Sequence, residues 1–276
     1  MKKIKKENRP LALFFLILIL ASAVAETLII TIQLEILYPV LMWIPAIAAM
    51  AATGYRLRSE GESGRRGRLL RECGVRRCRI APILLACLLP MIYLLIPYLV
   101  YWKTYPENFA YTGVPFSVVL LDLAPVTVIG VFGALLTAAG EEIGWRGFLL
   151  PELRRNFGMN RALVISSLIW CAWHLPLLIF GDYMEGAPLW YKVPAFILCI
   201  FPVGIMAGLL TFRTDSIWPA AFLHAAHNNY DQAVFSVITR GDNQMLWVSE
   251  TGWLTVVCAW ILAVVCYLTM RNKLRC

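Results

Sequence analysis

The chain has 276 residues, of which 60% are hydrophobic, with a mean hydropathy of +0.68 and a formal net charge of +8. Soluble domains are only about half apolar, so this composition excludes an ordinary soluble protein. It predicts an all-α polytopic membrane protein, and we treat residues 1–276 as one membrane domain.

The N-terminal segment begins with four lysines and continues into an apolar run that ends near residue 32. A basic start followed by an apolar run is also the pattern of a signal peptide. The run holds about 20 residues, enough to span a bilayer, so we favour an uncleaved first helix. Seven further apolar runs are also long enough to span. Together with the first they give eight predicted spans, at about 11–32, 36–54, 80–102, 116–140, 160–180, 191–212, 216–239 and 250–270.

The distribution of positive charge predicts the orientation of these spans. With both termini in the cytosol, 22 of the 25 Lys and Arg residues lie in cytosolic segments, and only Lys103, Lys192 and Arg240 lie on the other side. This asymmetry is what the positive-inside rule describes. Because topology accounts for the net charge, we expect no nucleic-acid partner. The expected location is the cell membrane, and the sequence leaves the oligomeric state open.

The first polar cluster inside the apolar sequence is A-G-E-E-I-G-W-R-G-F-L-L-P, residues 139–151. On a helix, Glu142 and Arg146 are four residues apart and share a face, so they can pair. Glu141 points about 100° away from that face. A carboxylate in an apolar, partly dry site suits a general base acting on water. The structural alternative is a salt bridge at the membrane surface.

Two later spans carry histidines. His174 lies in I-W-C-A-W-H-L-P, residues 169–176, where a lone intramembrane histidine can also serve only helix packing. In residues 217–231, His224 and Asn228 are four apart, and so are His227 and Asp231. Polar groups this close together inside a span are too costly to face lipid, so we expect them to share a polar cavity or a polar network.

Together these groups suit the hydrolysis of an acyl bond. A glutamate can activate water with help from a histidine, and a second histidine and an amide can donate hydrogen bonds to the developing oxyanion. The same residues could instead hold a divalent metal such as Zn²⁺ through Glu141, His174 and His224. The sequence contains no H-E-x-x-H and no G-x-S-x-G motif.

The ordered motifs E-E-x-x-x-R (Glu141, Glu142, Arg146), aromatic-x-x-x-H (Trp170, His174) and H-x-x-x-N (His224, Asn228) resemble those of the CPBP intramembrane proteases. This family includes the type II CAAX prenyl endopeptidases and the bacterial Abi proteins. The resemblance covers about residues 130–232, which we take as the catalytic core. Trp170 stands where phenylalanine is commonest, and the second pair, His227 and Asp231, leaves the register of the third motif open.

The resemblance implies eight helices around a polar chamber that is open to the cytosolic leaflet. It implies that Glu141 is the general base, that His174 helps to activate water, and that His224 and Asn228 stabilise the oxyanion. Glu142 and Arg146 would shape the site. The substrate would be a membrane-embedded, prenylated or short peptide. The family is often described as metalloproteases, and the presence of a metal stays open here.

Two other functions remain on the basis of sequence. One is a scaffold or bacteriocin-immunity protein that uses the same fold without proteolysis. The other is an ion-coupled transporter in which Asp122, His227 and Asp231 form a proton relay. The sequence shows no internal repeat of the kind common in transporters.

Overall fold

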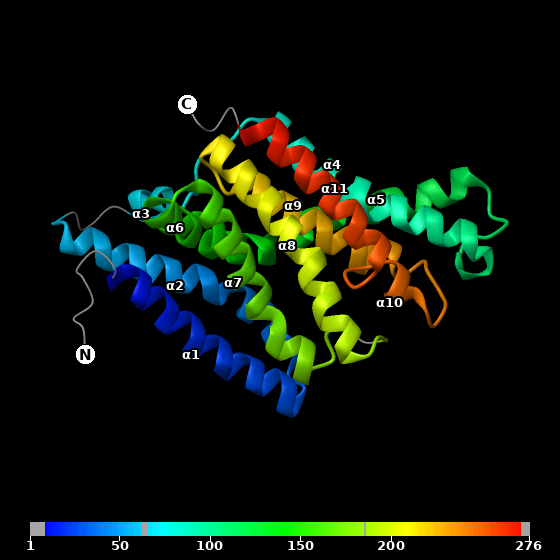
Figure 1. Ribbon diagram of the computed structural model, residues 1–276, viewed down its shortest axis with the longest axis horizontal. Coiled ribbons are helices and arrows are strands. Elements are labelled where there is room, and N and C mark those ends of the chain that lie inside the picture. Colours follow the sequence, from blue (N-terminus) through cyan, green and yellow to red (C-terminus); the bar gives the residue numbers. More distant parts are fainter. Residues whose placement is uncertain (1–8, 62–65, 185, 272–276) are drawn as a thin grey trace.

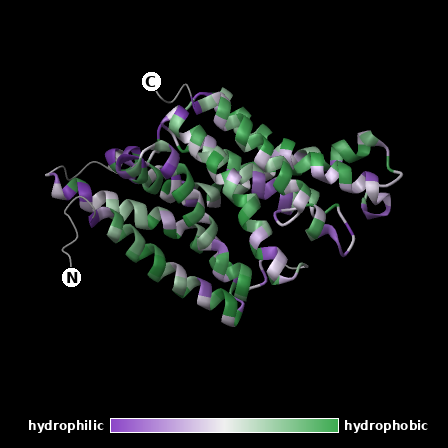
Figure 2. Cartoon of the chain, viewed as in Figure 1, coloured by the Kyte–Doolittle hydropathy of each residue, from purple (hydrophilic) through white to green (hydrophobic). Residues whose placement is uncertain are grey.

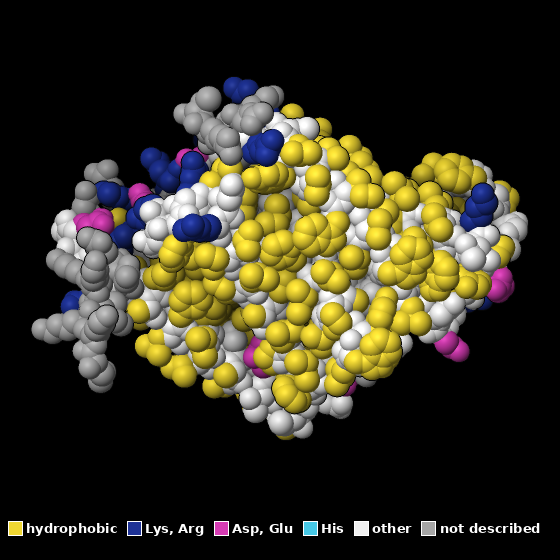
Figure 3. All heavy atoms as spheres, viewed as in Figure 1, with side chains coloured by type: hydrophobic (Ala, Val, Ile, Leu, Met, Phe, Trp, Pro, Cys, Tyr) yellow, Lys and Arg dark blue, Asp and Glu magenta, His cyan; other side chains and the backbone are white. Residues whose placement is uncertain are grey.

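The computed structural model describes residues 9–61, 66–184 and 186–271. It is all-α, and in these residues the only β pairing is an isolated bridge between Phe109 and Thr239. The long helices lie side by side in one bundle (Figure 1). Hydrophobic residues predominate along the helices in Figure 2, and apolar side chains cover most of the face seen in Figure 3. The helices are α1 (Arg9–Ile32), α2 (Tyr38–Ser59), α3 (Arg66–Glu72), α4 (Ile80–Thr104), α5 (Phe116–Glu142), α6 (Leu150–Phe157), α7 (Met159–Phe180), α8 (Leu189–Thr214), α9 (Trp218–Asn228), α10 (Gln244–Trp247) and α11 (Trp253–Met270).

Seven helices of the described residues are long and apolar enough to cross a membrane. They coincide with seven of the eight predicted spans. The remaining span, predicted at 216–239, is a helix formed by α9 and a π-helical continuation, η5 (Asn229–Phe235). Its polar residues make it too hydrophilic for the same criterion, and it is placed among α4, α5 and α8. Neighbouring helices rather than lipid therefore surround it.

One connecting segment is more deeply buried than its charged residues suggest. Residues 141–161 lie between the predicted spans 116–140 and 160–180, and there α5 continues through a π-helical turn, η4 (Ile143–Leu149), into α6. Residues 141–150 are all buried. Burial follows because η4 packs against α2, which brings both glutamates and Arg146 into the interior of the bundle. The sequence did not indicate this burial, because the charged residues of the segment resemble those of a surface loop.

Glycines allow η4 and the end of α5 to approach α2 closely. A Cβ on Gly140 would lie 2.8 Å from the carbonyl oxygen of Met42, and one on Gly144 would lie 2.3 Å from Cβ of Pro45. Small residues at such crossings are the usual means by which membrane helices pack tightly. This contact fixes the position of the Glu141–Glu142 pair relative to α2.

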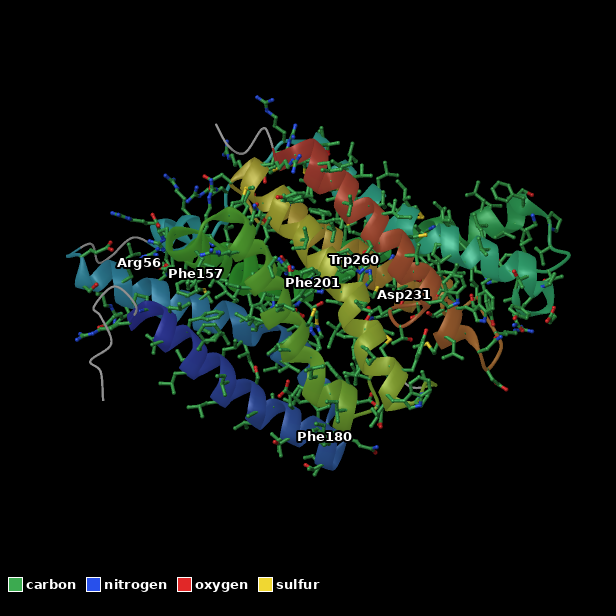
Figure 4. The ribbon with its side chains drawn as sticks, in the orientation of Figure 1. Arg56, Phe157, Phe180, Phe201, Asp231 and Trp260 are labelled. Atoms are coloured by element: carbon green, nitrogen blue, oxygen red, sulfur yellow. The ribbon has the colours of Figure 1, made fainter. Side chains whose placement is uncertain are left out.

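The two ends of the bundle differ in charge. The last turns of α2, α6 and α8 carry Arg56, Arg58, Arg154, Arg155 and Arg213, and Arg271 follows α11. We call this the basic end. Figure 3 shows Lys and Arg side chains gathered there, and in Figure 4 Arg56 and Phe157 lie at this end while Phe180, the last residue of α7, lies at the other.

Candidate active site

A cavity of about 310 Å³ lies among α2, α7, α8 and α9, with the end of α5 at one side. Four of the six predicted site residues line it: Glu141, His174, His224 and Asn228. The rest of the wall is mainly aromatic and aliphatic, with Leu41, Trp170, Trp173, Leu177, Phe196 and Ile200. The polar residues of three separate spans therefore share one mostly apolar cavity, as the sequence predicted.

Glu141 is 1% exposed, and its carboxylate is held by two tryptophans. The indole nitrogens of Trp170 and Trp145 donate hydrogen bonds to Oε2 at 2.8 and 3.2 Å. Both of these bonds end on the same oxygen, which leaves Oε1 as the oxygen able to bind a water or a substrate. Two fixed donors orient the carboxylate without adding a neutralising positive charge.

Glu142 points away from the cavity, as the 100° offset predicted, and belongs to a buried ion group. Its Oε1 accepts hydrogen bonds from Arg146 at 2.7 Å and from Nδ1 of His224 at 3.0 Å. The side chains of Glu142 and Arg146 are 0% and 1% exposed. The i,i+4 pair is thus confirmed, but it lies in the protein interior rather than at the membrane surface.

His174 is fixed by the backbone of its own helix. Its Nδ1 lies 2.8 Å from the carbonyl oxygen of Trp170. Since a carbonyl oxygen only accepts, Nδ1 carries the hydrogen, and in the neutral ring Nε2 has the free lone pair. The ring packs between Trp173, Tyr183 and Phe196. The imidazole is therefore held in one tautomer with its acceptor nitrogen available.

Trp170 connects the three motifs. Its indole donates to Glu141, its carbonyl accepts from His174, and its ring packs against His224 with centroids 5.2 Å apart. The guanidinium of Arg146 lies over the same ring, 4.3 Å from its centroid. The sequence marked this residue only as the aromatic of the second motif. A phenylalanine at this position could not donate the hydrogen bond that Glu141 receives here.

Both registers of the third motif contribute to the site. His224 joins the ion group at Glu142, and Asn228 is half-buried on the cavity wall. His227 also lines the cavity, with Nδ1 2.7 Å from the hydroxyl of Tyr93. Asp231 instead accepts hydrogen bonds from Tyr98 and Ser249 beside the cavity. In Figure 4 it lies near α11.

Glu250 is a cavity residue that sequence reasoning missed. It precedes α11 in a short connection, yet it is 1% exposed and accepts hydrogen bonds from His227, Tyr183 and Gln232 at 3.0, 2.9 and 3.3 Å. Burial opposes its ionisation, but the hydrogen bonds from His227 and Tyr183 outweigh this and lower the pKa of Glu250. Burial, together with the nearby Glu250 charge, raises the pKa of Tyr183 well above its usual value, so that hydroxyl stays a donor.

The residues predicted as metal ligands are not gathered into a coordination set. Within 9–61, 66–184 and 186–271, no three His, Cys, Asp or Glu side chains are close enough together to hold a metal ion. Because Glu141, His174 and His224 are not close enough together in this arrangement, a zinc site made by these three does not fit it, and we derive no chemical step through a metal.

The proton relay imagined for a transporter is not assembled either. Asp122 is exposed near the start of α5, and its carboxylate accepts a hydrogen bond from Tyr111. His227 and Asp231 have the other partners described above.

Comparison with known proteins points to the family that the motifs indicated. Residues 123–230 match the model of the Rce1-like type II CAAX prenyl endopeptidase family. A protein of Methanococcus maripaludis named CAAX prenyl protease 2 is 27% identical over 145 residues, which are 51% of this chain. The match spans about half of that relative, 50% of its length. This segment, which contains Glu141, His174, His224 and Asn228 on one cavity, is therefore similar to the Rce1-like type II CAAX prenyl endopeptidases, whose motifs the sequence resembles.

Proposed function

We propose that the protein is an intramembrane endopeptidase in which Glu141 activates a water molecule. The observation that carries this proposal is a buried carboxylate at the inner end of a mostly apolar cavity, with Oε2 fixed by two indoles and Oε1 free, beside the other two motifs. The catalytic residues lie within 130–232, while Tyr38, Leu41, Met42 and Glu250 complete the cavity from outside this core.

The first step is the attack of water on a peptide carbonyl. Glu141 Oε1 accepts a proton from the water as the oxygen attacks. His174 assists through Nε2, because Nδ1 is committed to the Trp170 carbonyl. When the tetrahedral intermediate collapses, the proton held by Glu141 passes to the leaving amine. The water supplies the hydroxyl of the new carboxyl group and one proton of the new amine, so atoms and charges balance.

The oxyanion is stabilised from the opposite wall. His224 can donate from Nε2 when its ring is protonated, and the Glu142 carboxylate on Nδ1 stabilises that form. Asn228, one helical turn later, can donate from its amide. Arg146 balances the charge of Glu142 and holds it in place, so the pair positions His224 without contacting the substrate.

The orientation in the membrane follows from the charge of the two ends. By the positive-inside rule the basic end, where α1 begins and α11 ends, faces the cytosol. We therefore propose a multi-pass protein of the cell membrane with both termini in the cytosol.

The test is cleavage of membrane-anchored peptides, prenylated and unprenylated, by detergent-purified protein, read by mass spectrometry. We expect the wild type to cleave and Glu141→Gln to be inactive. Glu26→Gln is the matched control, because Glu26 is a buried carboxylate on α1 that does not line the cavity. Equal cleavage by wild type and Glu141→Gln would refute the mechanism. A Glu141→Gln variant that retained the full cellular phenotype would favour a scaffold or immunity role.

The same assay decides the metal question. Since the three predicted ligands are not gathered, cleavage should survive incubation with a strong chelator. Loss of activity with chelator and its return with zinc would show that the ligands rearrange around a metal.

A further inference from the structure

The catalytic cavity reaches the surface in the half of the bundle away from the basic end. Its lining includes Tyr38, the first residue of α2, and Tyr183, which follows the end of α7. It also includes Glu250, just before α11, and the exposed side chain of Gln232 near the end of η5. Tyr38, Tyr183 and Glu250 thus lie at the ends of α2, α7 and α11 opposite the ends that carry arginines.

Buried side chains follow Glu141 toward the basic end. Along the chain from Glu141 to the arginines of α6, the side chains of Glu142, Trp145, Arg146 and Phe148 are all buried. A second cavity of about 300 Å³ does open at the basic end, and its lining includes Arg56, Arg146 and Glu152. Glu141 is not part of that lining. The two linings share no residue, and Glu141 lines only the cavity whose mouth residues lie away from the arginines, as far as the described residues show.

The two expectations taken from the sequence therefore conflict. A chamber open to the cytosolic leaflet and termini in the cytosol require the cavity mouth and the basic end to be at the same end of the bundle. The mouth residues of the cavity lie away from the arginines. In Figure 4, Arg56 lies at the basic end, and Phe180, three residues before the mouth residue Tyr183, lies at the opposite end. Of the two, the charge asymmetry is the stronger guide, because only Lys103, Lys192 and Arg240 lie on the mouth side.

We propose that the active site opens to the side of the membrane opposite the cytosol and takes an extended, largely apolar peptide segment presented there. This rests on the proposed endopeptidase function and adds the side of entry and the class of substrate. Most residues of the lining are aromatic or aliphatic, which suits apolar side chains, and the polar Gln232 and Glu250 stand at the mouth. Cytosolic prenylated C-termini would meet the basic end.

The side of entry can be measured without any activity. Cys78, half-buried at the basic end, is a free thiol, and Gln232→Cys in a Cys78→Ser/Cys276→Ser background places a thiol at the mouth. A membrane-impermeant maleimide should label this Gln232→Cys variant in intact cells. In the Cys276→Ser protein, which keeps Cys78, it should label Cys78 only after permeabilisation. The reverse pattern would overturn the proposal, and so would a folded Gln232→Cys variant that stays unlabelled even after permeabilisation.

A second arm tests the substrate. Sealed proteoliposomes, sorted by orientation through the same labelling, are given an apolar peptide either free or attached to a lipid of the outer leaflet. Cleavage is expected where the mouth faces the added peptide. Comparing the cleavage of the free and the lipid-attached peptide shows whether the substrate enters from the aqueous phase or from the membrane. Cleavage only where the basic end faces the peptide overturns the entry side. No cleavage in either orientation counts against the endopeptidase function, while the labelling result still stands.

Discussion

The buried pair Glu142–Arg146 gives the sharpest prediction for stability. Replacing Arg146 with methionine leaves a carboxylate that is 0% exposed with His224 as its hydrogen-bond donor, and its Oε2 has no partner in the described structure even in the wild type. Removing one member of a buried ion pair costs about 3–5 kcal/mol. Loss of the cation–π contact with Trp170 adds about 0.5–2 kcal/mol.

The measurement is the free energy of unfolding in mixed micelles, followed by the helical circular dichroism signal. Arg155→Met is the matched control, because Arg155 pairs with Glu152 but its side chain is 57% exposed, and such pairs contribute about 0–1 kcal/mol. The double variant Glu142→Gln/Arg146→Met should be more stable than Arg146→Met alone, because no unpaired charge remains buried. If Arg146→Met is no more destabilising than Arg155→Met, the pair is not buried as described.

Three further predictions concern the walls of the site. Trp170→Phe keeps the ring but removes a charge-assisted hydrogen bond to Glu141, so peptide cleavage should fall by about tenfold or more in kcat; unchanged kcat would mean that this bond does not orient the base. Ionised Glu250 stabilises the fold above its ordinary pKa of 4.5, and this contribution is lost as pH falls through its lowered pKa. Glu250→Gln should therefore be less stable than wild type at neutral pH and lose less stability on acidification, and parallel stability–pH curves for the two proteins would contradict this. Gly144→Ala should destabilise by about 1–3 kcal/mol through its contact with α2, whereas Gly133→Ala, which meets open space, should unfold like the wild type; equal stability of the two variants would argue against the close crossing.

The sequence predicted the parts of this molecule that depend on local pattern. Apolar length located the spans, and helical periodicity placed Glu142 beside Arg146 and turned Glu141 away. The grouping of His174, His224 and Asn228 also followed, because polar groups inside spans must find each other rather than lipid.

What could not be predicted depends on contacts between distant segments. The residues around Glu250 in the sequence suggest an ordinary surface position. Only the fold brings Glu250 to His227 and to Tyr183, which is 67 positions earlier in the chain. Trp145 belongs to the same motif as Glu141, but nothing in the sequence indicates that its indole nitrogen donates a hydrogen bond to that carboxylate. Periodicity assigns a face to a residue but does not say which side chain of another helix lies opposite.

The π-helical turns have a consequence for chain length. α5 ends at Glu142 and α9 ends at Asn228, and in both places the next seven residues form the wider helix, η4 and η5. Such a turn contains one residue more than an α-helical turn, so it accommodates an extra residue while the helix beyond it keeps its register. Deleting one residue from 143–149 or 229–235 should therefore give a plain α-helix whose flanking segments still face the same way. Inside the turn itself, the deletion would change which side chains face the interior of the bundle.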